Sequence, residues 1–285
     1  MSTDLKWIEP IGGLGDALML SSVLKLVHDR LGTKYNMIRR TRYAEIFVGH
    51  PAIARVDYLP KGARMQAVTY WHCDEMDDGT VPRAFQMLAK MFGLELPVPE
   101  TMYLPMDGVS EGPLASMIPW RAKNVAIAPD STSPRKMMSR DKWGQIAKAL
   151  GERGALSVQF GENGAEKVKY AYSLAGVTTP KEVIMLLKRM NLLITSDNFL
   201  MHAAHLTGTP AISLWGPTDS ASYGYPEQQK IAVPCRLESA KCIRNTAGAE
   251  RTGLYVSKCQ AQTSCMDSIS TEDVVTRAAG ILWPG

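Results

Sequence analysis

Three polar turns in this 285-residue chain carry residue types that bind phosphate groups. In the first turn, Ser131, Thr132 and Lys136 lie between an apolar stretch at 124–128 and a predicted helix. Hydroxyl groups and cations that converge after a strand suit a phosphate-bearing ligand. From this segment alone, a solvated loop with surface cations is the simpler alternative.

The second turn follows the apolar stretch 191–195 and begins with Asp197. Its carboxylate would repel a diphosphate, so we expect Asp197 to cap and orient the turn. The main-chain amides of Asn198 and Phe199, at the start of the next helix, would donate hydrogen bonds to a diphosphate. His202, one turn into that helix, either points back to the same pocket or is an ordinary helix histidine.

The third turn, Gly216–Asp219, follows the apolar stretch 211–215. Its Thr218 hydroxyl could contact a phosphate or a base, and a tight turn without a ligand is the alternative. Ligands of open α/β sheets bind beyond the carboxyl ends of the strands, so we expect this turn to lie beside Asp197.

A glycine-rich turn, Gly12-Gly13-Leu14-Gly15, precedes Asp16 near the start of the chain. Bare amides and the helix dipole favour negative charge at such a place. The turn lacks the complete glycine fingerprint of a dinucleotide site and the Gly-Lys-Ser/Thr of a phosphate loop. Asp16 is also a favourable residue for the first turn of a helix, which is the simpler interpretation.

The elements that must position these turns alternate between strands and helices, as in α/β proteins. Five prolines and two glycines between 96 and 121 exclude a helix or a central strand there and predict a domain boundary after residue 118. The fold class predicted is therefore two Rossmann-like α/β domains, 1–118 and 119–285, that face each other across a cleft. Predicted strands are 5–11, 35–39, 54–59, 66–71, 124–128, 155–160, 191–195 and 211–215, and predicted helices begin near 14, 42, 82, 140, 164, 180 and 198.

Composition supports two ordinary globular domains. The length corresponds to about two domains, and 45% hydrophobic with 21% charged residues is typical of folded proteins. A net charge of only +4 argues against nucleic acid as a partner. Because no secretory signal or spanning apolar stretch is seen, we expect a cytoplasmic protein with at most peripheral contact at the inner face of the membrane.

Two further groups of residues have open interpretations. Arg39, Arg40 and Arg42 form a basic cluster that would bind an anionic ligand or simply be a solvated face. Four late cysteines lack paired Cys-x-x-Cys spacing, so a structural zinc or iron and buried thiols are both open. These cysteines are Cys235, Cys242, Cys259 and Cys265.

Taken in order, these segments resemble glycosyltransferase family 9, the ADP-heptose:lipopolysaccharide heptosyltransferases and their relatives. No single motif is specific, but the ordered set is, and it extends from residue 11 to about 283. The matching pieces are Gly15-Asp16, Lys136 seven residues before Trp143, Ser196-Asp197 with His202-Ala203-Ala204, Gly208-Thr209-Pro210, Trp215 to Asp219, and Cys265-Met266 with Ile269 and Val274.

The resemblance implies a metal-independent, inverting transferase of the B-type glycosyltransferase architecture that acts in lipopolysaccharide biosynthesis. It implies that a nucleotide-sugar donor, ADP-heptose or a related compound, binds the C-terminal domain and that a glycan or glycolipid acceptor binds the N-terminal one. Asp16 matches the general base, Gly13 and the arginine cluster fall on the acceptor side, and no cofactor is needed for catalysis. The donor residues implied are Lys136, Ser131, Thr132, Asp197, Asn198, Phe199, His202 and Thr218, with Glu162 a candidate for the ribose hydroxyls.

Departures from the family pattern leave other functions open. Phe199 stands where the family usually has glycine, and its ring could crowd the phosphates. Met138 and Ser139 replace a common Trp-Pro pair, so the sugar need not be a heptose. The alternatives are a non-catalytic sugar-nucleotide-binding protein of the same fold and a sugar-nucleotide hydrolase or epimerase.

Overall fold

The computed structural model describes residues 5–39, 43–69, 83–110, 112–234 and 264–284. The chain divides into two units, Met1–Gly108 and Val109–Gly285, each built on its own parallel sheet. The boundary predicted after residue 118 falls a short way further along the same proline-rich segment.

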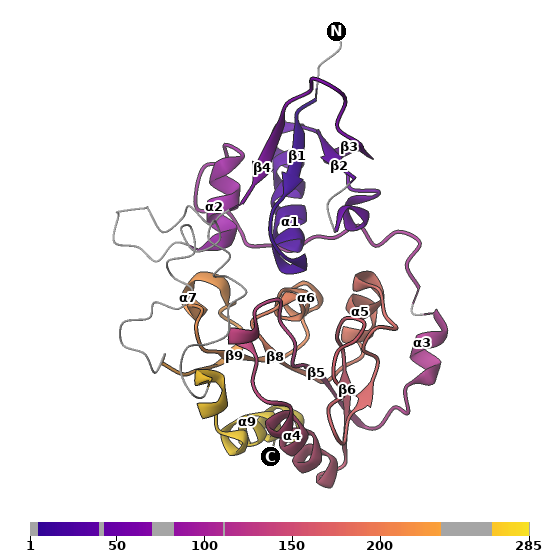
Figure 1. Ribbon diagram of the computed structural model, residues 1–285, viewed down its shortest axis with the longest axis vertical. Coiled ribbons are helices and arrows are strands. Elements are labelled where there is room, and N and C mark those ends of the chain that lie inside the picture. The colour runs from indigo at the N-terminus through magenta and orange to yellow at the C-terminus, as the bar shows by residue number, and fades with distance from the viewer. Residues whose placement is uncertain (1–4, 40–42, 70–82, 111, 235–263, 285) are drawn as a thin grey trace. The chain divides into compact units, whose positions relative to one another are not determined.

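Unit 1 contains a four-stranded parallel sheet in the order β3-β2-β1-β4 (Figure 1). Helix α1 buries the aliphatic residues Leu20, Val23, Leu24 and Val27, whereas Leu31, in its last turn, is 54% exposed. The strands are β1 (Trp7–Pro10), β2 (Tyr35–Ile38), β3 (Ile53–Asp57) and β4 (Met65–Val68), and the helices are α1 (Leu14–Leu31), the 3₁₀ turn η1 (Ala44–Phe47) and α2 (Ala84–Met91).

Unit 2 contains a six-stranded parallel sheet in the order β10-β9-β8-β5-β6-β7. The strand order reverses between β5 and β8, and ligands of doubly wound sheets bind beyond the carboxyl ends of strands at such a reversal. The strands are β5 (Lys123–Ala128), β6 (Ala155–Gln159), β7 (Tyr172–Ser173), β8 (Leu192–Ser196), β9 (Ala211–Trp215) and β10 (Gln229–Ala232). The helices are α3 (Gly112–Met117), α4 (Arg140–Glu152), α5 (Pro180–Leu187), α6 (Phe199–Thr207), α7 (Ser220–Tyr223) and α9 (Thr271–Leu282), with 3₁₀ turns η3 (Pro134–Lys136) and η5 (Cys265–Ser268).

The core of unit 2 lies between the sheet and the pair of helices α4 and α9, which run side by side (Figure 1). Trp143 and Ile146 of α4 and Val274 of α9 are fully buried against Ile127 of β5. Burial of this apolar surface is the main driving force that holds β5 and the loop after it in place.

Two predictions of secondary structure were wrong. The helix predicted over 164–175 does not form, because the Gln159 side chain hydrogen bonds to the Glu166 carbonyl (2.8 Å) and the Val168 amide (2.8 Å) and fixes a non-helical path. Conversely, the proline-rich segment does contain a short helix, α3, whose Pro113 sits in the first turn, where proline is tolerated.

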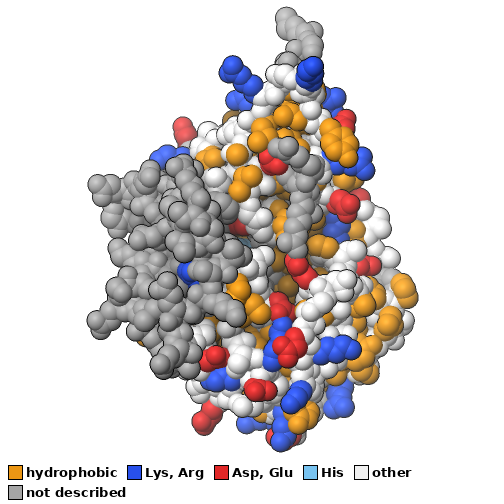
Figure 2. All heavy atoms as spheres, viewed as in Figure 1, with side chains coloured by type: hydrophobic (Ala, Val, Ile, Leu, Met, Phe, Trp, Pro, Cys, Tyr) orange, Lys and Arg blue, Asp and Glu red, His pale blue; other side chains and the backbone are white. Residues whose placement is uncertain are grey.

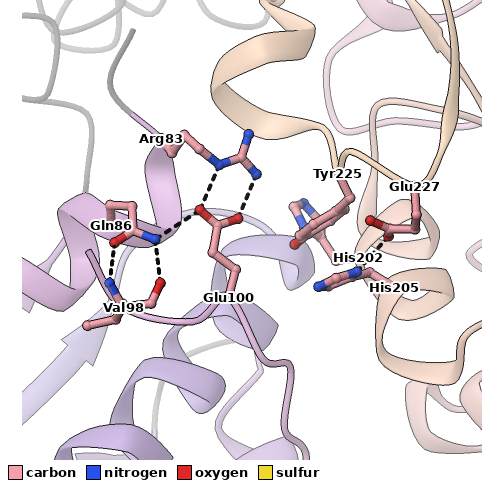
Figure 3. Close-up of polar contacts among 8 residues, drawn as sticks. All are labelled: Arg83, Gln86, Val98, Glu100, His202, His205, Tyr225 and Glu227. Atoms are coloured by element: carbon pink, nitrogen blue, oxygen red, sulfur yellow. Dashed lines mark hydrogen bonds and ion pairs between the residues drawn. The ribbon is translucent and has the colours of Figure 1, made fainter. Parts of the chain in front are cut away.

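Acidic and basic side chains are interspersed on the face shown in Figure 2. In unit 1, α2 is joined to the segment that follows it by two side chains (Figure 3). Arg83 binds both carboxylate oxygens of Glu100 at 2.6 Å, and Gln86 bonds to the amide and carbonyl of Val98 at 2.9 and 2.8 Å.

Candidate functional site

The three predicted phosphate-binding turns converge on one carboxylate in unit 2. The Lys136 ammonium lies 2.8 Å from Asp197 Oδ2, and the Thr218 hydroxyl donates to the same oxygen at 2.7 Å. From the loop after β5, the Ser131 hydroxyl also donates to the Asp197 carbonyl at 3.3 Å. Turns that are far apart in sequence therefore meet at the strand reversal between β5 and β8, and the Gly216–Asp219 turn lies beside Asp197 as predicted.

Asp197 is ionised in this setting. Burial alone would raise the pKa of its carboxyl group, but the Lys136 charge and the hydrogen bonds from Lys136 and Thr218 outweigh burial and lower that pKa. An ionised carboxylate neutralises Lys136 when no ligand is bound. A ligand phosphate that binds Lys136 must therefore share this cation with Asp197 or displace the carboxylate.

The residue that caps α6 is Asn198, so the prediction that Asp197 caps the turn was wrong. The Asn198 side-chain oxygen accepts from the Leu200 amide at 2.8 Å, which is the usual capping contact. Asp197 instead orients the turn through Lys136 and Thr218. Phe199 is the first residue of α6 and is partly exposed, and it occupies the helix start where phosphate binding was predicted.

His202 is buried and belongs to a network that includes three residues not predicted from the sequence (Figure 3). Its Nδ1 lies 2.7 Å from the Tyr225 hydroxyl. His205 stacks on the Tyr225 ring with centroids 3.9 Å apart, and its Nδ1 lies 2.6 Å from Glu227. Burial lowers the pKa of His202 to about 4, so its ring is neutral at pH 7.

Two predicted donor residues lie further out. Thr132 is exposed on the loop after β5, and Glu162 is exposed in the turn after β6. Asp130 lies in the loop after β5 and forms an ion pair with Arg140 at the start of α4. Burial raises the pKa of Asp130, and repulsion from Glu162 and Glu166 raises it further. The charge and hydrogen bond of Arg140 act in the opposite direction.

In unit 1, Asp16 lies at the third position of α1 and its carboxylate accepts from the amide of Gly13, the N-cap residue, at 2.5 Å. Gly12 adopts φ of +127°, and a side-chain carbon there would collide with the Asp16 carboxylate. The glycine turn is therefore shaped around this carboxylate. The role of Asp16 as a base and the role of Gly13 in acceptor binding stay predictions.

The basic cluster is described only in part. Arg39 is exposed directly after β2, and its amide donates to the Asp57 carbonyl at 2.8 Å. Arg40 and Arg42 lie outside the described residues.

Of the four late cysteines, only Cys265 lies within the described residues, where it is buried at the start of η5. Its sulfur and that of Met266 lie so close to Gly216 that a side-chain carbon there would be 2.9 and 2.6 Å from them. In the described ranges, no three His, Cys, Asp or Glu side chains gather as metal ligands would. Cys235, Cys242 and Cys259 fall outside those ranges, so the metal prediction stays open.

Residues 44–252 match the family model described as glycosyltransferase family 9 (heptosyltransferase). The chain belongs to glycosyltransferase family 9. Among curated proteins, it is 27% identical to lipooligosaccharide heptosyltransferase 2 of Haemophilus influenzae over 137 residues. That alignment covers 44% of this chain and 39% of the relative, so it spans less than half of each protein.

Solved structures of three glycosyltransferases share the fold of this chain at low identity. The family 9 glycosyl transferase from Veillonella parvula has a TM-score of 0.65 at 14% identity and covers 100% of this chain and 99% of its own. E. coli ADP-heptose lps heptosyltransferase II scores 0.63 at 15% identity, with 98% of each chain covered. The iron-containing dodecameric glycosyltransferase TibC of enterotoxigenic E. coli scores 0.67 at 15% identity, covering 98% of this chain and 77% of TibC.

These similarities confirm the predicted fold class, two Rossmann-like α/β domains of the B-type glycosyltransferase architecture, for this family 9 member. In the described part of the chain, no helix combines the length and apolar character that crossing a membrane requires.

Proposed function

We propose that this family 9 protein is an inverting glycosyltransferase that moves a sugar from a nucleotide diphosphate to an acceptor hydroxyl. The observation that carries the proposal is the ammonium of Lys136, held at the strand reversal beside the N-terminus of α6. A cation and a helix N-terminus together stabilise the charge that develops on a departing diphosphate. ADP-heptose is the proposed donor and a cell-envelope glycan or glycolipid the proposed acceptor.

The proposed chemistry needs no metal. Asp16 takes the proton of the acceptor hydroxyl while that oxygen bonds to the anomeric carbon and the bond to the diphosphate oxygen breaks, inverting the configuration. Lys136 and the amides of Asn198 and Phe199 stabilise the leaving diphosphate, and Thr218 and neutral His202 help to hold the nucleotide.

The remaining predicted residues have supporting roles in this proposal. Ser131 and Thr132 would contact the phosphates and Glu162 the ribose hydroxyls, while Gly13, Arg39, Arg40 and Arg42 would bind the acceptor.

The test is transfer from ADP-heptose to a panel of glycan acceptors, measured with the wild type, Asp16→Asn and Lys136→Met. We expect general-base loss in Asp16→Asn to lower turnover by about 10² to 10⁴ while ADP still binds. Full turnover by Asp16→Asn would overturn its role as base.

The partly exposed ring of Phe199 at the start of α6 favours one second candidate, a sugar-nucleotide-binding protein without transfer activity. Product analysis separates the two functions. Binding of ADP-heptose without transfer to any acceptor and without hydrolysis supports the second candidate, whereas release of free sugar in the absence of acceptor indicates a hydrolase.

A further inference from the structure

The Asn198 side chain joins two segments of the candidate site through four hydrogen bonds. Its oxygen accepts from the Leu200 amide at 2.8 Å and from the Thr195 hydroxyl at 2.9 Å, both in its own segment. Its Nδ2 donates to the carbonyls of Asp130 at 2.7 Å and Ala128 at 3.2 Å, at the end of β5. These contacts use both N–H donors and both oxygen lone pairs of the side-chain amide, so this side chain bonds within the protein and not to a ligand.

The loop that carries Lys136 is fixed at its base by the same contacts. Asp130 at the start of the loop receives Asn198 on its carbonyl and Arg140 on its carboxylate. Because Arg140 is the first residue of α4, the ion pair ties the two ends of the loop together. Asn198 then fastens this closed loop to the turn that contains Asp197.

We propose that Asn198 is a positioning residue, which sets where the Lys136 ammonium stands relative to the N-terminus of α6 and so tunes the site for a diphosphate. This inference rests on the proposed function for its ligand. Capping alone does not require asparagine, because a serine hydroxyl also caps a helix. A serine has a single hydroxyl hydrogen, however, and cannot donate to both carbonyls while it caps.

The variant that tests the proposal is Asn198→Ser, because serine keeps a capping oxygen and loses both donations to the β5 segment. The chain offers a matched control in Asn124, a buried asparagine of unit 2 that lies at the opposite end of β5. Its side chain bonds to the amide and carbonyl of Arg121 at 2.9 and 2.6 Å. Asn124→Ser therefore removes comparable main-chain contacts at a place remote from Lys136 along the strand.

The first measurement is amide hydrogen exchange of the full chain without ligand. In Asn198→Ser we expect amides of residues 131–138 to exchange at least about tenfold faster than in the wild type, because a local restraint on the loop is lost. In Asn124→Ser the same amides should keep the wild-type rate. Wild-type exchange in Asn198→Ser, or equal acceleration in both variants, would overturn the proposal.

The second measurement is calorimetric binding of ADP and of AMP to the same three proteins. If Asn198 positions Lys136 for a diphosphate, Asn198→Ser should weaken the affinity for ADP about tenfold or more. The same variant should change the affinity for AMP by less than about threefold. Equal weakening of both nucleotides would indicate general loosening of the site and refute the positioning role. A wild type that binds no ADP would contradict the proposed donor, and the exchange result would then decide whether Asn198 holds the loop.

Discussion

Lys136 and Thr218 both bind the same oxygen, Oδ2 of Asp197, at 2.8 and 2.7 Å. The two residues belong to turns after β5 and β9, and Asp197 follows β8, which lies between those strands in the sheet. The carboxylate therefore joins the three turns and balances the charge of Lys136.

The first prediction concerns the stability of this ion pair. Lys136→Met leaves Asp197 as a buried carboxylate without its counter-charge, and breaking such a pair typically destabilises a protein by about 3 kcal/mol. We expect the free energy of unfolding in urea to fall by about that amount and the pKa of Asp197 to rise. Turnover should fall by about 10²-fold or more, because a fixed donor to the leaving group is lost.

A double variant separates folding from catalysis in that experiment. Lys136→Met combined with Asp197→Asn has no buried unpaired charge, so most of the lost stability should return while turnover stays low. If turnover returned together with stability, Lys136 would act only on the fold.

The second prediction concerns the turn shaped around Asp16. Gly12→Ala places a methyl group against the Asp16 carboxylate at φ of +127°, whereas Gly62→Ala meets a similar backbone restriction at φ of +81° with open space around it. Both variants should lose about 1–3 kcal/mol of unfolding free energy from backbone strain. Only Gly12→Ala should lower turnover by about 10²-fold or more, through displacement of the base. Equal activity in both variants would count against Asp16 as the base.

The sequence predicted the location of the candidate site because its signals are local. Apolar runs that end in polar turns placed Ser131, Lys136, Asp197 and Thr218 after strands, and β9 was predicted with its observed bounds. The rule that ligands bind at the carboxyl ends of parallel strands then brought these turns together.

What the sequence could not supply depends on tertiary contacts. Asp and Asn both favour capping positions, so the choice of Asn198 over Asp197 required the backbone conformation and the Lys136 contact. Tyr225 reaches His202 from 23 positions away, and no local pattern predicts that contact. The signal that could have pointed to Tyr225 is only its place in an aromatic turn that follows the Thr218 segment.

The third prediction concerns the Tyr225 hydroxyl. Tyr225→Phe removes the partner of His202 Nδ1 but keeps the ring on which His205 stacks. Because the buried nitrogen loses its hydrogen bond, we expect a loss of about 1–3 kcal/mol of unfolding free energy. Tyr225→Leu should lose more, since the stacked ring is lost as well. Denaturant melts of both variants check this order, and a Tyr225→Phe protein as stable as the wild type would contradict it.

The fourth prediction is a loss of stability between pH 6.5 and pH 4. Burial lowers the pKa of both His50 and His202 to about 4, and each ordinarily titrates at 6.5. In that window these two histidines bind protons in the unfolded chain but not in the folded chain, so their contribution to the free energy of unfolding falls as the pH falls. Each histidine contributes at most about 1.4 kcal/mol per pH unit.

A variant of His50 tests whether the buried histidines cause this acid sensitivity. The Nε2 of His50 lies 2.8 Å from the Ser21 carbonyl and its Nδ1 accepts from the Ala52 amide at 3.1 Å, a pair of contacts that only the neutral ring satisfies. Asp197, whose pKa is lowered, loses its stabilising charge only below about pH 4, so it contributes little to the slope above that value. His50→Gln should therefore be less stable at pH 7 but show a shallower dependence on pH between 6.5 and 4. Urea titrations at half-unit steps measure both slopes, and an unchanged slope in His50→Gln would show that His50 does not carry the acid sensitivity.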